Sequence, residues 1–159
     1  MTTYDYFKSP QGRMLLVADG KGLAHVGFIG QKYAPRIAAD WHRDAAHPLL
    51  RKAKRELGEY FSGKRQRFSV KLAPRGTSFQ RSVWKAISGV GFGRTIAYAE
   101  LARRAGRPGS ARAAGAATGR NPIGVIVPCH RIVGADGSLT GYAGGLAKKK
   151  ALLALEARA

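Results

Sequence analysis

At 159 residues with 45% hydrophobic content, the chain can form one ordinary domain or two small lobes, and it has no apolar run near the roughly 18 residues that span a membrane. Its single cysteine excludes an internal disulfide and a multi-cysteine zinc site, and its N-terminus lacks the pattern of a secretion signal, so we expect a cytoplasmic, prokaryotic protein. Lys and Arg number 28 against 9 acidic residues, and this net charge of +19, spread over both halves of the chain, predicts a nucleic acid partner.

The first half of the chain predicts a small sheet with one helix. Short apolar runs separated by SPQG and GKG are typical of strands joined by tight turns. A longer segment repeats apolar residues at helical spacing and is followed by Gly63, a common residue just after a helix. APRGT at 73–77 is typical of a linker, so the expected N-terminal α/β domain covers residues 1–74. The predicted strands are 4–9, 13–19, 23–29 and 67–72, and the predicted helix is 48–61.

The second half, residues 75–159, predicts a mostly helical domain. Apolar residues recur at helical spacing in each segment, and Thr77 and Ser110 stand where N-terminal caps are expected. Two of the helices are separated by a short Gly/Pro turn, which is the pattern of a helix-turn-helix. The predicted helices are 77–90, 95–106, 110–121 and 145–159.

The segment 110–121 is unusual for a helix that reads DNA. Major-groove readers carry Asn, Gln and Arg toward base edges, whereas residues 111–117 of this segment present Arg112 among alanines and a glycine. A nearly bare helix can enter a widened minor groove, with Arg112 filling the space of a displaced base. The alternative is a close helix–helix crossing inside the protein, which favours the same small residues.

The stretch IVPCHRIVG contains Cys129 directly before His130. Two readings are open, because a lone cysteine among apolar residues is usually a core residue, while a cysteine beside a histidine can be a nucleophile. Neighbouring side chains of an extended chain point to opposite faces, so the pair needs a turn or a bridging water to exchange a proton. The histidine would need a third group to orient it, and Glu156, Glu100 and Asp136 are the candidates. Glu156 is favoured because it lies on the apolar face of a predicted helix, where an unpaired carboxylate is costly.

PCHRIVG, the preceding NP of NPIGVIVPCH and the later GYAGGLAKKKALLALE together resemble the O6-alkylguanine-DNA alkyltransferases, the methylated-DNA–protein-cysteine methyltransferases. The resemblance runs from about Thr77 to Glu156, and FGRTIAYAELA and SARAAGAA are similar to the helix-turn-helix of that family. It implies an α+β fold: a ribonuclease H-like N-terminal domain of three strands and a helix, then a mostly helical domain with a helix-turn-helix. It also implies direct, irreversible transfer of an alkyl group, typically methyl, from O6-alkylguanine or O4-alkylthymine in double-stranded DNA to the protein.

The resemblance further implies roles for individual residues. Cys129 would accept the alkyl group, His130 would draw off its proton through a water, and Glu156 would orient His130. Asn121 would brace the cysteine loop, and Tyr98 would assist nucleotide rotation and donate to the leaving guanine. The implied DNA-contacting residues are Arg112, which would replace the flipped nucleotide, with Thr95, Tyr98, Ser110, Ala111, Ala113, Ala114 and Gly115. The implied base pocket comprises Tyr98, Thr118, Ile132, Tyr142, Ala143 and Gly144.

Three functions are to be distinguished: a single-turnover alkyltransferase, a non-catalytic relative that binds alkyl lesions for another repair pathway, and a helix-turn-helix regulator. The alkyltransferase is favoured because the non-catalytic relatives replace the cysteine, and because residues 111–117 have no base-reading side chain except Arg112. We expect no cofactor, no metal and no obligate protein partner. The N-terminal lobe has no cysteine, and DWHRDAAH at 40–47 has loose spacing for a metal site.

Overall fold

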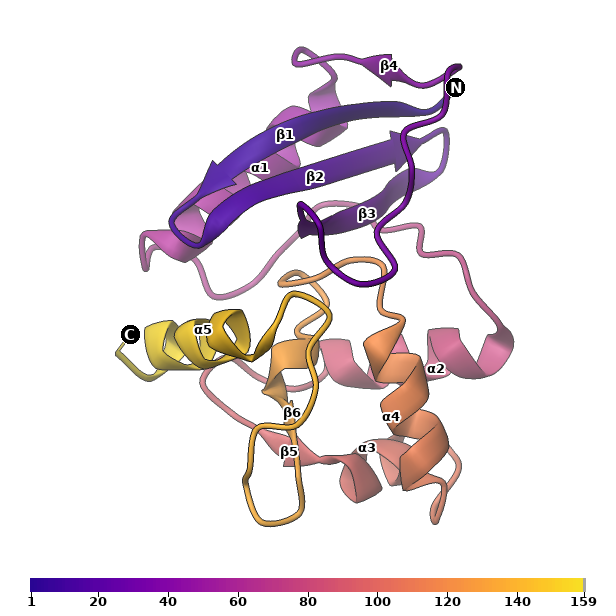
Figure 1. Cartoon of the computed structure of the whole chain (residues 1–159), viewed down its shortest axis with the longest axis vertical. Coiled ribbons are helices and arrows are strands. Elements are labelled where there is room, and N and C mark those ends of the chain that lie inside the picture. The colour runs from indigo at the N-terminus through magenta and orange to yellow at the C-terminus, as the bar shows by residue number, and fades with distance from the viewer. Residues whose placement is uncertain (159) are drawn as a thin grey trace.

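Three consecutive strands form an antiparallel sheet in the computed structural model, which describes residues 1–158 (Figure 1). They are β1 (Thr3–Ser9), β2 (Gly12–Asp19) and β3 (Gly22–Phe28), as the apolar runs and intervening turns predict. A two-residue strand, β4 (His42–Arg43), pairs in parallel with β1 and gives the order β3-β2-β1-β4. The N-terminal sheet therefore has four strands where three were expected. The additional strand β4 is only two residues long, which is too short for a sequence pattern to predict it.

Helix α1 (Pro48–Phe61) has the bounds that its apolar spacing predicts, and it packs against one face of the sheet (Figure 1). The His47 side chain accepts a hydrogen bond from Leu49 N and caps the helix. Pro48 suits the first turn, where its missing N–H would have no partner in the helix. The buried apolar face of α1 carries Leu50, Ala53, Leu57 and Tyr60.

The prediction of a strand at 67–72 is wrong, because the structure forms no strand over these residues. The Glu56 carboxylate, fully buried on α1, accepts hydrogen bonds from the backbone N–H groups of Ser69 and Val70 at 2.9 and 3.1 Å. Because these two donors are bound to a side chain, they are not available to a neighbouring strand. Pairing is limited to one bridge between Leu72 and β3.

Helices make up most of the second lobe, which follows a stretch at 73–77 with neither helix nor strand. Thr77 caps the first helix through reciprocal hydrogen bonds with Gln80. Ser110 is at the N-cap position of α4, although its side chain makes no capping hydrogen bond to any residue of 1–158. No helix in this described range is long and apolar enough to cross a membrane. The helices are α2 (Ser78–Ser88), α3 (Tyr98–Arg104), α4 (Ala111–Gly119) and α5 (Leu146–Arg158).

Helix α3 begins later than its apolar spacing predicts. The residues before it form strand β5 (Ile96–Ala97), which pairs in parallel with β6 (Ile132–Val133). The prediction of a helix from Thr95 is therefore wrong over its first three residues. The competing interaction is a long-range backbone pairing, which a local spacing pattern does not reveal.

The two lobes meet along β3 and along α1, and they share one hydrophobic core. Val26 N–H donates to Pro122 O at 2.9 Å, and Gly124 N–H donates to Val26 O at 2.8 Å. The segment that leads to Cys129 is thus paired with the edge of the N-terminal sheet. Figure 1 shows this segment between the sheet above and the helices below.

Candidate active site

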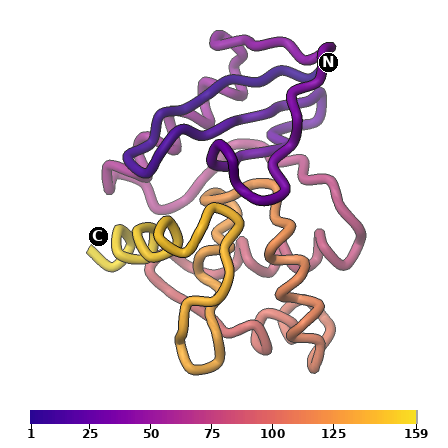
Figure 2. Tube along the Cα trace, in the orientation of Figure 1, coloured from indigo at the N-terminus to yellow at the C-terminus, as the bar shows by residue number. Residues whose placement is uncertain are grey.

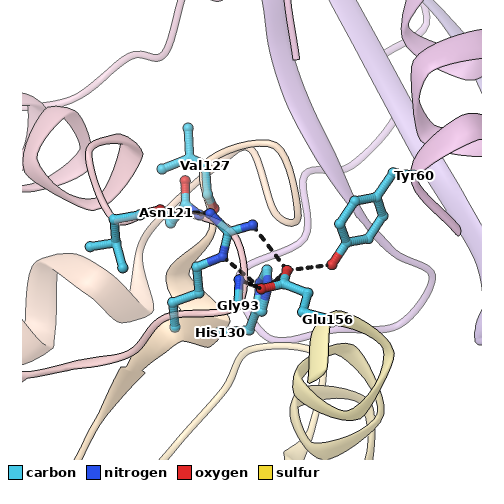
Figure 3. Close-up of polar contacts among 8 residues, drawn as sticks. Tyr60, Gly93, Asn121, Val127, His130 and Glu156 are labelled. Atoms are coloured by element: carbon cyan, nitrogen blue, oxygen red, sulfur yellow. Dashed lines mark hydrogen bonds and ion pairs between the residues drawn. The ribbon is translucent and has the colours of Figure 1, made fainter. Parts of the chain in front are cut away.

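The segment between Asn121 and Cys129 is folded around one side chain. Asn121 Oδ1 accepts the Ile123 N–H at 3.0 Å, and Asn121 Nδ2 donates to Val127 O at 2.9 Å (Figure 3). Between these contacts, buried Val125 has a φ of 69°, a strained value for a β-branched residue. Asn121 therefore holds the loop in a conformation that its own backbone disfavours.

Cys129 begins a single 3₁₀ turn, η1 (Cys129–Arg131), and its N–H donates to Val127 O at 2.8 Å. Adjacent side chains point to opposite faces only in an extended chain. Because Cys129 and His130 lie in a turn, this argument against proton exchange between them does not apply. The cysteine is 8% exposed. Burial raises the pKa of the Cys129 thiol above its ordinary value, while the Asn121 side chain and the Lys149 ammonium act in the opposite direction.

His130 is fully buried and is held by Glu156 of α5. The distance from His130 Nε2 to Glu156 Oε2 is 2.6 Å (Figure 3). His130 Nδ1, the other ring nitrogen, is buried without a hydrogen-bond partner among the described residues. Burial lowers the pKa of His130 and opposes the effect of the carboxylate, so the imidazole is neutral at neutral pH. A neutral ring that donates from Nε2 to a carboxylate has its accepting lone pair at Nδ1.

The Glu156 carboxylate is the centre of a buried hydrogen-bond network that joins both lobes (Figure 3). Its oxygens accept from Tyr60 Oη at 2.6 Å, from Arg131 Nε and Nη2 at 2.9 and 3.0 Å, and from Gly93 N at 3.1 Å, in addition to His130. Burial alone would raise the pKa of this carboxyl, but hydrogen bonds from His130 and Arg131 hold it well below the ordinary range. Glu156 is therefore an ionised group with its charge paired, as its place on an apolar helix face requires.

Lys149 is a second buried charge near the cysteine. Its Nζ donates to Ile132 O at 2.6 Å, Thr140 O at 2.9 Å and Gly141 O at 3.3 Å. Burial lowers the pKa of this ammonium, and Cys129 acts in the opposite direction. The lysine thus fixes both ends of the loop that runs from β6 to the GYAGG stretch, and it places a positive charge near the thiol.

Cys129 lines a cavity of about 720 Å³, which is within the range of small-molecule sites. Tyr98, the first residue of α3, points its hydroxyl to Thr140, whose Oγ1 donates to it at 3.1 Å. The cavity brings together residues from α3, α4, the cysteine turn and the GYAGG stretch, far apart in sequence. The predicted site residues on its wall are Tyr98, Ala113, Gly115, Thr118, Cys129, Tyr142 and Ala143.

Helix α4 has small residues on two faces, one packed inside the protein and one exposed. Ala114 and Ala117 are buried, and Trp84 of α2 donates its indole N–H to Ala117 O at 2.9 Å. Arg112 and Ala113 are exposed on the other side of the helix. The side chain of Ala114, for which a DNA contact is expected, is completely covered by the packing of α4 on the lobe. The remaining residues with an expected DNA contact lie exposed or half-buried: Thr95, Tyr98, Ser110, Ala111 and Gly115.

Two predicted pocket residues do not line the cavity. Ile132 is fully buried in β6, where pairing with β5 turns it into the core, so its side chain is not a wall of the pocket. Gly144 lies behind the wall, in close packing: a Cβ built on it would lie 3.0 Å from both Phe28 Cδ2 and Tyr142 Cε2. A side chain at this position would therefore push the wall residue Tyr142.

Several residues of the site have little or no signal in the sequence. Arg131 follows the cysteine in the PCHR motif, which is a usable signal for it. Lys149 is one of three consecutive lysines, and Tyr60 is one of several apolar residues on α1, so neither has a local signal. Lys32 and Tyr33 of the N-terminal lobe also line the cavity, although the expected pocket lay wholly in the second lobe.

Comparisons with known proteins agree over both lobes. Residues 2–74 match the 6-O-methylguanine DNA methyltransferase ribonuclease-like domain, and residues 78–158 match the DNA binding domain of the same family. A methylated-DNA–protein-cysteine methyltransferase of Methanosarcina barkeri is 49% identical over 96% of both chains, and one of Haemophilus influenzae is 42% identical over 96% of this chain and 85% of its own. The crystal structure of Mycobacterium tuberculosis OGT in complex with DNA superposes with a TM-score of 0.91 at 42% identity, covering 98% of this chain and 93% of that one.

Proposed function

Because this chain belongs to the family of methylated-DNA–protein-cysteine methyltransferases, we propose that it repairs DNA by taking an alkyl group from O6 of guanine, or from O4 of thymine, onto its own Cys129. The observation that carries the proposal is the position of Cys129 at a cavity, next to the buried His130–Glu156 pair. A cysteine that is only part of the hydrophobic core would not be expected to line a cavity or to lie next to a buried histidine–carboxylate pair.

Proton removal is the first step, because a thiolate is the nucleophile and burial keeps the Cys129 thiol protonated. His130 Nδ1 takes this proton through one water, since Nε2 is bound to Glu156. The Glu156 carboxylate orients the ring and stabilises the imidazolium that forms. Arg131 contributes by keeping that carboxylate ionised.

Alkyl transfer is then a single displacement at carbon. The Cys129 sulfur attacks the alkyl carbon in line with its bond to guanine O6, so that the S–C bond forms as the C–O bond breaks. The bonding pair leaves with the base, and Tyr98, on the wall of the same cavity, donates a hydrogen bond to this developing anion. The product is a thioether, which water does not cleave under mild conditions, so each protein molecule acts once.

DNA engagement is assigned to α4 and its flanking residues. The exposed part of this helix has small side chains around Arg112, which suits entry into a widened minor groove. The flipped base enters the cavity, and Arg112 occupies the space that it leaves in the duplex. The net charge of +19 supplies sequence-independent attraction to phosphates, which makes binding weaken steeply with salt.

The decisive experiment is an intact-mass measurement after mixing the protein with duplex DNA that contains one O6-methylguanine. We expect a gain of one methyl group per protein molecule, located at Cys129 by peptide mapping. Tight lesion binding without a mass gain would instead indicate a protein that only marks the damage. Absence of any preference for lesion DNA would indicate a regulator.

Replacing Arg112 by alanine should slow repair of duplex DNA by about 10-fold, because the unstacked duplex loses the side chain that offsets part of the cost of flipping. Alkylation of Cys129 by the free base O6-benzylguanine should stay within about twofold of the unchanged protein, since no duplex is opened. Rates of both reactions would be followed by intact mass. Arg51→Ala is the matched control, because Arg51 is an exposed arginine on α1, remote from α4. An equal loss with both substrates would contradict the proposed role of Arg112.

A further inference from the structure

The segment that follows β3 leaves the N-terminal sheet and reaches the candidate active site. Figure 2 shows this part of the chain, near residue 30, hanging below the sheet toward the second lobe. Gln31 closes the turn at the end of β3: its Oε1 accepts the Phe28 N–H at 2.9 Å, and its own N–H donates to Phe28 O at 3.2 Å. Gly30, with a φ of 79°, permits this turn. The turn directs Lys32 and Tyr33 at the cavity of Cys129.

Residues 31–34, here named the strap, contact both sides of the cavity. On one side, Lys32 N–H donates to the carbonyl of Ala143, in the GYAGG stretch, at 3.2 Å. On the other side, the Arg120 guanidinium, just beyond α4, lies 3.8 Å from the centroid of the Tyr33 ring. The strap thus bridges the two walls, one on the loop and one on the helix, between which the base is proposed to enter.

Tyr33 is held in this position against a local preference. Its φ is 63°, in the left-handed region that a bulky residue rarely adopts. Tyr33 is 51% exposed, so hydrophobic burial alone does not account for the conformation. The Arg120 guanidinium and the Lys32 ammonium lie 3.8 and 5.1 Å from the centroid of its ring, and the adjoining Lys32 N–H is bound to Ala143. Tyr33 itself lines the cavity. Strain that neighbouring contacts maintain is typical of a functional position.

We propose that Tyr33 is a specificity-determining residue of the alkyl-transfer site, whose ring closes the cavity toward the N-terminal lobe and limits the size of the alkyl group that fits beside Cys129. This inference rests on the proposed function. It adds a wall from the N-terminal lobe to a pocket whose other expected residues come from the second lobe. The consequence is preference for methyl over bulky aromatic alkyl groups.

The test compares transfer rates from two duplexes that carry O6-methylguanine or O6-benzylguanine, measured as alkylation of Cys129 by intact mass. In Tyr33→Gly, glycine keeps the positive φ and the ring is lost, so the ratio of benzyl to methyl rate should rise by about 10-fold, the discrimination expected of one pocket contact. Tyr33→Phe retains the ring over Arg120 and should keep the unchanged ratio. Tyr6→Ala removes a tyrosine of β1 that also stacks with arginine but does not line the cavity, and it should have no effect on the ratio.

The outcomes separate this inference from the function on which it rests. A benzyl-to-methyl ratio that stays within about twofold in Tyr33→Gly, in a protein that still alkylates Cys129, contradicts the role of Tyr33 alone. An equal rise in Tyr33→Phe also contradicts it, because the ring would then not be the barrier. A wild-type protein that gains no mass from either duplex contradicts the proposed function and with it the inference.

Discussion

Replacing Cys129 by serine should abolish alkyl transfer while leaving lesion binding in place. We expect the rate to fall by at least about three orders of magnitude, because a serine hydroxyl stays protonated near neutral pH and is a far weaker nucleophile than a thiolate. Binding should persist because α4, with Arg112, does not depend on the sulfur. Intact mass after incubation with O6-methylguanine duplex measures the transfer, and fluorescence anisotropy of a labelled duplex measures the binding.

The serine hydroxyl would lie in a site that is only 8% exposed, so a fold defect must be separated from loss of the nucleophile. Cys129→Ala is the control, because it also removes the nucleophile but places no hydroxyl that needs a hydrogen bond in the buried site. Both variants should melt within a few degrees of the unchanged protein, because the change in buried volume is small. Transfer by Cys129→Ser at the normal rate, or methylation at another residue, would refute the assignment of the nucleophile.

Glu156→Gln should lower both the free energy of unfolding and the rate of alkyl transfer, because the same carboxylate pairs with Arg131 and orients His130. We expect the free energy of unfolding to fall by about 3 kcal/mol, since the buried guanidinium of Arg131 loses its charge partner. The rate of transfer should fall by at least about 100-fold, since His130 loses the group that makes it an effective base. Denaturant unfolding followed by tryptophan fluorescence measures the first effect, and intact mass measures the second at a temperature where the variant is folded.

Tyr60→Phe is the matched control, because it removes one of the hydrogen bonds to Glu156 and leaves the charges in place. Its expected cost is about 1 kcal/mol, with transfer reduced far less than in Glu156→Gln. Equal loss of transfer in the two variants would show that lobe docking, and not the His130–Glu156 pair, controls activity.

The pH dependence of stability provides a second check on Glu156. Its folded-state pKa lies below the ordinary value of 4.5, so its contribution is present in full above that value and is lost as the pH falls below it. The stability difference between the unchanged protein and Glu156→Gln should therefore shrink as the pH falls from about 5 to about 3. The carboxyls of Asp5, Asp19 and Glu56, whose pKa values are also lowered, are common to both proteins and cancel in the difference. Because Glu156 also raises the pKa of His130, both proteins carry His130→Gln in this measurement, so that only Glu156 differs in titration. A difference that stays constant over this range would then mean that Glu156 is not ionised in the folded protein.

Local pattern predicted the helices better than the strands. Helix α1 has the predicted bounds, and the Thr77 cap places the start of α2, because spacing and capping depend on residues within a few positions. The strand at 67–72 failed because a carboxylate from α1 takes its backbone donors, and β4 and β5 were missed because their partners are distant in sequence. Strand pairing is a long-range property, and two-residue strands have almost no local signal.

The candidate site divides in the same way. Sequence by itself determined the cysteine, its neighbouring histidine, the family and the choice of Glu156, because a carboxylate on an apolar helix face must have a partner. Only the tertiary structure decided what surrounds them: that Tyr60 and Arg131 complete the partners of Glu156, that one lysine of three is turned inward, and that Tyr33 reaches the cavity from the other lobe. The reason is physical. The residue type determines which interactions a side chain can make. Burial and long-range packing determine which of several identical side chains makes them.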